Sequence, residues 1–200
     1  MPKTFSESER AYIQQRLKEE AKICLAQYGV RKTTVDELVK RVKIPKGTFY
    51  LFYESKELLL FEVFLAFHDE IQAKLISDLT DLKGELDAQK FTQLIWKLYR
   101  TVEESFMLQF MTNGEMELLI RKLPSEIAKI HAEKDDFSVE NLISLVPQMK
   151  NVNCKAFSAA LRGIFMAMLH KHEIGEEVFD EALKIMIQGV VIQMFEGEVS

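Results

Sequence analysis

The sequence predicts an all-α protein, and two observations support that fold class. Glycine and proline, which interrupt helices, are scarce, with 8 and 4 occurrences in 200 residues. Apolar residues also recur at three- and four-residue steps along almost the whole chain, which is the spacing of one helix face. We therefore expect about nine helices and no strand.

The first four helices are expected before a polar loop at residues 81–87. The apolar face of the first consists of Ile13, Leu17, Ala21, Cys24, Leu25 and Tyr28. Gly29 can end this helix in a left-handed conformation. Thr34 and Glu37 have the spacing of a capping box at the start of a short second helix. Pro45 suits the first turn of a third, and Ser55 can cap a long fourth helix.

Five further helices are expected after this loop. They cover residues 88–111, 115–122, 125–145, 154–172 and 176–196. Together with the first four they suggest two domains, 1–54 and 55–200.

Charge differs between the two ends of the chain. Residues 1–60 contain 12 Lys or Arg and 8 Asp or Glu, a net charge of +4, whereas the whole chain carries −5. A basic head on an acidic body fits a protein that presents one end to a polyanion. Chance unevenness among solvated helix faces would give the same numbers, so charge alone does not decide the function.

Residues 33–52 have the pattern of a helix-turn-helix, with two short helices joined by a tight link. The second helix would enter the major groove of DNA, with Phe49 packed inward. Pro45 and Gly47 would bring its start close to the DNA backbone. Its exposed residues are expected to be Lys46, Thr48 and Tyr50.

The run TTVDELVKRVKIPKGTFYLFYESKELL, which starts at Thr33, resembles the N-terminal domain of TetR-type transcriptional regulators. The similarity covers about residues 10–65, and the rest of the chain resembles the family only in its helical architecture and length. The segment 44–46 (Ile-Pro-Lys) differs from the usual Val-Ser-Lys and loses a hydroxyl cap.

The resemblance implies a set of DNA contacts, most of which would position the protein on phosphates rather than read bases. Lys46 and Thr48 could reach base edges, whereas the hydroxyls of Tyr50 and Tyr53 would bind phosphate. Lys56 would pair with phosphate at the start of the fourth helix. The full set is Thr33, Thr34, Lys46, Gly47, Thr48, Tyr50, Tyr53 and Lys56.

The resemblance also implies an effector domain in residues 55–200. Aromatic residues recur at three- and four-residue steps on the predicted helix 88–111, and Glu103 among them would favour a cationic ligand unless it faces solvent. Most of these aromatics could equally be core. The candidate pocket residues are Phe67, Trp96, Tyr99, Glu103, Phe106, Phe110 and Phe165, and the effector is expected to be a largely apolar small molecule.

The last two helices are too apolar to be buried on one side only, which predicts a two-fold homodimer through four helices. Charges at 180, 181 and 184 argue against membrane insertion. The expected interface residues are Phe157, Leu161, Ile164, Met168, Ile185, Met186, Gly189 and Val190.

The sequence predicts neither an enzyme nor a cofactor or metal site. The motifs of hydrolases, P-loops and dinucleotide-binding folds are missing, and the four histidines form no ligand cluster. The N-terminus lacks a signal-peptide pattern, so we expect a cytoplasmic protein. Cys154 alone is weak support for redox sensing.

These inferences together predict a dimeric repressor that binds a palindromic double-stranded operator and is released by a small molecule. The fourth helix would connect the two sites, and the coupling would be reciprocal. An activator, or a dimeric DNA-binding module that needs no ligand, remains the alternative.

Overall fold

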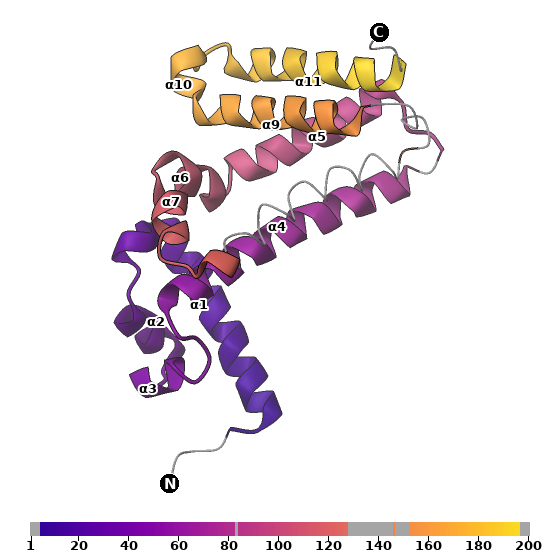
Figure 1. Cartoon of the computed structure of the whole chain (residues 1–200). Coiled ribbons are helices and arrows are strands. Elements are labelled where there is room, and N and C mark those ends of the chain that lie inside the picture. Colours follow the sequence, from indigo (N-terminus) through magenta and orange to yellow (C-terminus); the bar gives the residue numbers. More distant parts are fainter. Residues whose placement is uncertain (1–4, 83, 128–145, 147–152, 197–200) are drawn as a thin grey trace. The chain divides into compact units, whose positions relative to one another are not determined.

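A computed structural model describes residues 5–82, 84–127, 146 and 153–196, and within these ranges the chain is helical and contains no strand (Figure 1). The expected all-α class is confirmed. The described helices are α1 (Glu7–Lys32), α2 (Val35–Val42), α3 (Lys46–Phe49), α4 (Lys56–Asp81), α5 (Ala88–Glu103), α6 (Phe106–Thr112), α7 (Glu115–Ile120), α9 (Cys154–Leu169), α10 (Lys171–Ile174) and α11 (Phe179–Glu196). Most of the helix expected over 125–145 lies outside the described residues.

The chain divides into two compact units, and neither is continuous in sequence. The first combines Met1–His68 with Ser105–Ala128, and the second combines Asp69–Glu104 with Lys129–Ser200. This division differs from the expected boundary between residues 54 and 55. The reason is that α6 and α7 pack against α1, while an ion pair from Lys18 to Glu62 (2.6 Å) ties the start of α4 to α1.

The helix-turn-helix lies in the first unit and is built by local signals. Thr34 caps α2 by accepting a hydrogen bond from the Glu37 amide, and Lys43 ends the helix in the left-handed region, at φ 60°. Pro45 is the N-cap residue of the short α3. Leu38 from α2 and Phe49 from α3 are both fully buried, and burial of these apolar side chains stabilises the arrangement of the two helices.

The helix expected over 88–111 is two helices in the structure. α5 ends at Glu103, and the Ser105 hydroxyl caps α6 by accepting from the Met107 amide at 3.1 Å. A serine that can cap competes with helix continuation, which explains the break. The two helices also belong to different compact units, with α5 in the second and α6 in the first.

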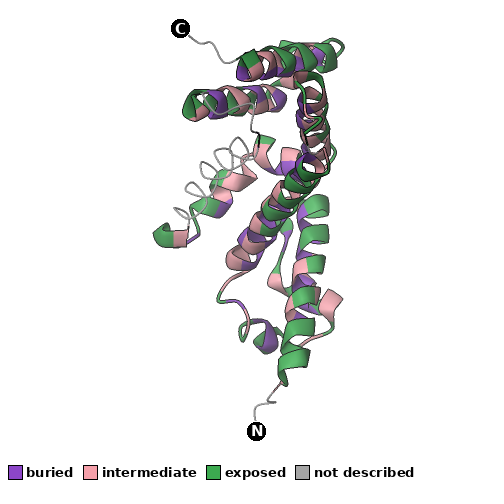
Figure 2. Cartoon of the chain, turned by 90° about the vertical axis from the view of Figure 1, so that its right-hand side faces the viewer, coloured by how far each residue is buried: buried purple, intermediate pink, exposed green. Residues whose placement is uncertain are grey.

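The second unit is centred on α11, which packs against both α5 and α9. Figure 2 shows α11 with buried and exposed sides. The fully buried residues of this helix follow one another at helical spacing: Phe179, Leu183, Ile187, Val191 and Met194. The helix expected over 154–172 ends earlier, because His170 leaves the helical conformation between α9 and α10.

Candidate nucleic-acid interface and candidate pocket

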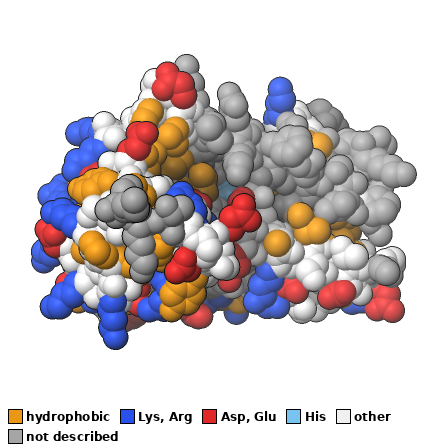
Figure 3. Space-filling view, turned by 90° about the horizontal axis from the view of Figure 1, so that it is seen from below, with side chains coloured by type: hydrophobic (Ala, Val, Ile, Leu, Met, Phe, Trp, Pro, Cys, Tyr) orange, Lys and Arg blue, Asp and Glu red, His pale blue; other side chains and the backbone are white. Residues whose placement is uncertain are grey.

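The short helix α3 has one buried face and one face that is exposed to solvent. Phe49 is fully buried, whereas the side chain of Tyr50 is 51% exposed and that of the following Leu51 is 57% exposed. Figure 3 shows the molecule from below in Figure 1, and in this view Lys and Arg side chains line one margin with apolar side chains between them. Lys43 and Lys46 are exposed beside and within α3, and an exposed helix with cationic side chains suits a polyanion.

Gly47 in α3 has no steric reason within the chain to be a glycine. Its φ is not in the left-handed region, and a Cβ atom added there would meet nothing within 4 Å. The backbone at this turn is therefore exposed, with no neighbouring side chain covering it. An exposed backbone allows a partner, such as a DNA strand, to approach more closely than any side chain would permit.

Lys46 lies beside Gly47 and forms an exposed ion pair with Asp36 of α2 (2.9 Å). The hydrogen bond to Asp36 raises the pKa of Lys46. Exposed pairs of this kind contribute at most about 1 kcal/mol. The ammonium group can therefore exchange its carboxylate partner for a phosphate at little cost.

The two threonines before α2 have different environments. Thr34 is exposed and caps α2, but the reciprocal half of the expected capping box is absent, since the Glu37 carboxylate accepts from Arg41 (2.6 Å) instead. Thr33 is fully buried, and its hydroxyl donates to the Gly29 carbonyl at 2.7 Å. Thr33 thus does not present its hydroxyl to a partner, although the resemblance places it among the DNA contacts.

Thr48 and Tyr53 are also more enclosed than expected. Thr48 is buried. The ring of Tyr53 is buried against Phe49, with 5.9 Å between ring centroids, and its hydroxyl donates to the Glu62 carboxylate at 2.6 Å. Burial, the largest cause, and the bond to Glu62 both raise the pKa of Tyr53. Its hydroxyl is engaged within the chain, because the start of α4 presents a carboxylate to it.

Lys56 is half-buried and bound to backbone. Its ammonium donates to the carbonyl of Val30 at 2.7 Å and also to the carbonyl of Thr33. Burial lowers the pKa of Lys56. Of the eight expected contact residues, the structure leaves four exposed, and these are Thr34, Lys46, Gly47 and Tyr50.

The seven expected pocket residues do not form one set. Phe106 packs against Phe67 (5.2 Å between centroids) and Phe110 packs against Phe64 (5.9 Å), all within the first unit. The remaining four lie in the second unit, and they are Trp96, Tyr99, Glu103 and Phe165. The expected single aromatic face is wrong because the break at Ser105 separates Phe106 and Phe110 from α5.

Tyr99 and Glu103 have partners inside the second unit. The Tyr99 hydroxyl donates to the Leu161 carbonyl at 2.7 Å, and its ring lies 6.3 Å from that of Phe165. Glu103 accepts from Arg100 and from Lys171, the latter at 2.7 Å. Arg100 and Lys171 already balance the negative charge of Glu103. This carboxylate therefore gives no reason to expect a cationic ligand.

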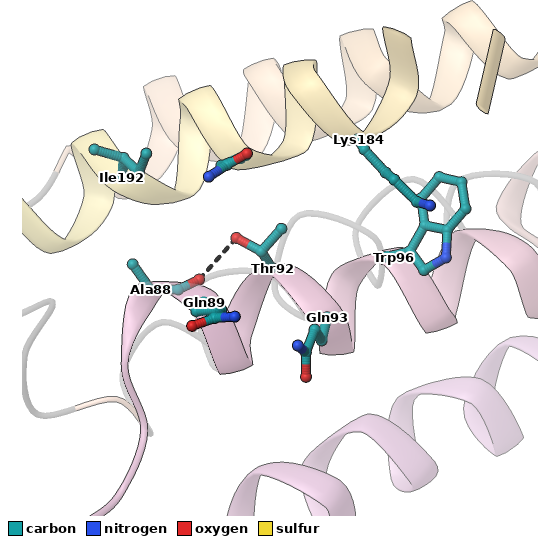
Figure 4. Close-up of a pocket in the computed structure, with 8 residues that line it drawn as sticks. Ala88, Gln89, Thr92, Gln93, Trp96, Lys184 and Ile192 are labelled. Carbon is teal, nitrogen blue, oxygen red and sulfur yellow. Dashed lines mark hydrogen bonds between the residues drawn. The ribbon is translucent and has the colours of Figure 1, made fainter. Parts of the chain in front are cut away.

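A pocket of about 460 Å³ lies between α5 and α11 (Figure 4). Of the expected pocket residues, Trp96 alone lines it. The Lys184 ammonium lies 4.6 Å from the centre of the Trp96 ring, and the Thr92 hydroxyl donates to the Ala88 carbonyl at 2.7 Å. The complete lining is Ala88, Gln89, Thr92, Gln93, Trp96, Lys184, Gln188 and Ile192.

Sequence reasoning missed Lys184 and Gln188 as pocket residues. It took them only as polar interruptions of an apolar helix. Their spacing of four residues, which places them on one face of α11, was the available signal. The volume lies in the range of small-molecule sites, roughly 300–1,000 Å³.

The expected dimer residues divide into buried and exposed ones. Phe157, Ile164 and Met168 of α9 are buried within the chain itself, so they cannot face a second copy. Ile185 of α11 is 63% exposed. Gly189 lies one turn further along α11, and a Cβ atom there would meet nothing within 4 Å.

The described residues contain no group of His, Cys, Asp and Glu that could hold a metal ion. Cys24 is buried and Cys154 is half-buried, and neither forms a disulfide. Among the helices that the structure describes, none combines the length and the apolar character needed to cross a membrane.

Residues 18–63 match the family model of the bacterial regulatory proteins of the tetR family. This segment contains the helix-turn-helix described above. This segment is therefore similar to the DNA-binding segment of TetR-family regulators. Beyond residue 63 the chain is similar in fold to solved structures of TetR-family regulators.

A curated relative is the HTH-type transcriptional regulator YuxN of Bacillus subtilis (strain 168), with 26% identity over 143 residues. The match covers 70% of this chain and 46% of YuxN, so the chain spans about half the length of this relative.

Two solved structures show that the fold is shared along nearly the whole chain. A TetR-family regulator from Mesorhizobium loti superposes with a TM-score of 0.69 at 16% identity, covering 96% of this chain and 98% of its own. The regulator FadR of Bacillus subtilis, solved in complex with stearoyl-CoA, has a TM-score of 0.54 at 18% identity, with 92% and 99% covered.

Proposed function

We propose that this chain is a sequence-specific, TetR-type DNA-binding regulator whose α3 enters the major groove. The observation that carries the proposal is the exposed face of α3, where Lys46, Gly47 and Tyr50 surround the buried Phe49. The glycine supports it further, because the chain itself gives no reason for that residue. Gly47 lies where base edges are read, and Thr34, Lys46 and Tyr50 contact phosphate.

The test is selection of bound duplexes from a random DNA library, followed by titration of the enriched site at several salt concentrations. Replacing Lys46 by Ala weakens binding and lowers the slope of log affinity against log salt by about 1 if its ammonium contacts phosphate. Lys90→Ala is a matched control, because Lys90 also forms an exposed ion pair, with Glu85 at 3.1 Å, but lies on α5. No enriched site at any salt concentration would contradict the proposal.

We further propose that the regulator acts as a two-fold homodimer and binds a palindromic operator. The exposed strip that suits this contact includes Gly163 and Met166 of α9 together with Ile185 and Gly189 of α11. The two glycines permit close approach of helices from two chains. Two α3 helices related by a two-fold axis would then meet two half-sites.

The effector-released repressor is the finer part of this proposal. The pocket between α5 and α11 combines a tryptophan face with the cation of Lys184, and no ion pair joins Lys184 to a carboxylate of the described residues. Such a site suits a small planar molecule with an apolar body and an anionic group. This replaces the cationic ligand that Glu103 suggested.

Trp96 makes the effector proposal directly testable, since it is the one tryptophan in the sequence. Benzoate and larger aromatic carboxylates are titrated while its fluorescence is recorded. Binding in the pocket changes the emission of the native protein and leaves that of a Lys184→Met variant unchanged. A response that survives in Lys184→Met places the ligand elsewhere.

The alternative is a regulator that activates, or one that binds DNA without any ligand. A bound effector that lowers operator affinity by about 5–150-fold supports release, within the usual range of coupling between sites. Operator affinity that is unchanged at saturating ligand supports the ligand-independent alternative.

A further inference from the structure

The last turn of α1, which follows its kink at Gly29, is held by two side chains from distant parts of the first unit. The helical path is interrupted at Gly29, which has φ 70° and ψ −177°. From there the segment Val30–Thr33 leads to the Thr34 cap of α2. Its direction therefore decides where α2 begins.

The first of these side chains is Glu115 of α7. Its carboxylate accepts a hydrogen bond from the Val30 amide at 2.6 Å, although the two residues are 85 positions apart. Val30 is fully buried, so without Glu115 its amide would lose its partner in a place that water does not reach. A Cβ atom on Gly29 would lie 3.1 Å from Cδ of Glu115, so a larger residue there would force this carboxylate to shift by a few tenths of an ångström.

The second is Lys56 at the start of α4. Its ammonium donates to the carbonyls of Val30 and Thr33, which are acceptors left free where a helix is interrupted. The two charges are opposite. Burial lowers the pKa of Lys56, and the nearby carboxylates of Glu57 and, to a smaller extent, Glu115 act in the other direction. An amide bound by an anion and two carbonyls bound by a cation leave this segment little freedom.

We infer that Lys56 and Glu115 are positioning residues for DNA binding, which hold Val30–Thr33 and so set the placement of α2 and α3, and that Lys56 does not contact phosphate. This inference rests on the proposed function as a DNA-binding regulator. It replaces the phosphate contact that the sequence pattern assigns to Lys56.

Salt dependence separates a positioning residue from a phosphate contact. Neutralising a phosphate releases counterions, so losing such a contact lowers the salt slope by about 1, whereas misplacing α3 weakens binding without that loss of one unit. Lys56→Met is expected to weaken operator affinity about tenfold with an unchanged slope. Lys46→Ala in the same titration is the phosphate-contact reference.

Glu115 gives an independent measurement, because a carboxylate does not bind phosphate directly. Glu115→Gln keeps an oxygen that accepts from the Val30 amide and is expected to stay within about twofold of native affinity, whereas Glu115→Ala weakens it about fivefold to tenfold. Amide hydrogen exchange at Val30 in the free protein accelerates in Glu115→Ala and is restored in Glu115→Gln.

The outcomes are distinct. A salt slope that falls by about 1 in Lys56→Met overturns the inference, as does Glu115→Ala with native affinity and native exchange at Val30. If Lys56→Met does not fold, the two Glu115 variants still decide whether the segment positions the DNA-binding helices. Native protein that selects no DNA site contradicts the proposed function instead, and Val30 exchange then still reports whether Glu115 holds the segment.

Discussion

At the scale of single residues, the Tyr53 hydroxyl is a structural group. It donates to Glu62, whose second carboxylate oxygen pairs with Lys18 of α1 at 2.6 Å. The carboxylate thus joins the link after α3 to α1. A hydrogen bond to a charged acceptor contributes about 1.5–3 kcal/mol when it is protected from water.

Tyr53→Phe is therefore expected to lower the free energy of unfolding by about 1–2 kcal/mol, since the ring stays and the hydrogen bonds of the hydroxyl with Glu62 and Gln14 are lost. Urea denaturation followed by circular dichroism measures it. Tyr12→Phe is the control, because Tyr12 is 67% exposed and the change there is expected to be within about 0.5 kcal/mol. An unchanged unfolding midpoint in Tyr53→Phe would show that the hydroxyl contributes nothing.

At the scale of elements, the link between α2 and α3 contains a residue in an unfavourable backbone conformation. Lys43 is the one non-glycine residue of the described chain with positive φ. Its amide donates to the carbonyls of Lys40 and Val39, so the left-handed turn closes α2. Left-handed backbone costs an ordinary residue roughly 1–2 kcal/mol, and glycine avoids this cost.

Lys43→Gly is expected to stabilise the protein by about 0.5–1 kcal/mol, the steric gain being partly offset by the entropy that glycine adds to the unfolded chain. Lys40→Gly, inside α2, is the matched control and is expected to destabilise by about 1 kcal/mol. Thermal unfolding of the two variants should move in opposite directions. If Lys43→Gly unfolds at lower temperature than the native protein, the turn carries no strain.

The elements that the sequence predicted well are those set by near neighbours. Thr34 and Pro45 mark the starts of helices from local chemistry alone. Gly29 was expected to end the first helix, but it is a kink inside α1, which continues to Lys32. The break at Ser105 was missed because the apolar spacing continues from Tyr99 through Phe106 across it. The partners of Lys56 and Glu115 could not be predicted, since no local pattern records contacts between residues 26 or 85 positions apart.

At the scale of the whole molecule, self-association should depend on the exposed side of α11. Ile185→Asp places a carboxylate in the proposed contact, at a cost of at least about 2 kcal/mol where it is desolvated. We expect the dimer dissociation constant to rise by about 30-fold or more, as measured by sedimentation velocity at several concentrations.

Ile120→Asp is the control for this prediction, because Ile120 is also an exposed isoleucine but lies on α7. It should leave self-association unchanged. A native protein that sediments as a monomer, or an Ile185→Asp variant that remains dimeric, would exclude α11 as the interface.

The first unit is assembled from two stretches of sequence, and this imposes an order on its synthesis. When the ribosome has reached residue 104, the emerging chain holds α1 to α3 but not α6 or α7. The acceptor for the Val30 amide has then not yet been made. A nascent chain therefore acquires its finished DNA-binding end only after α7 has left the ribosome, although that end lies first in the sequence.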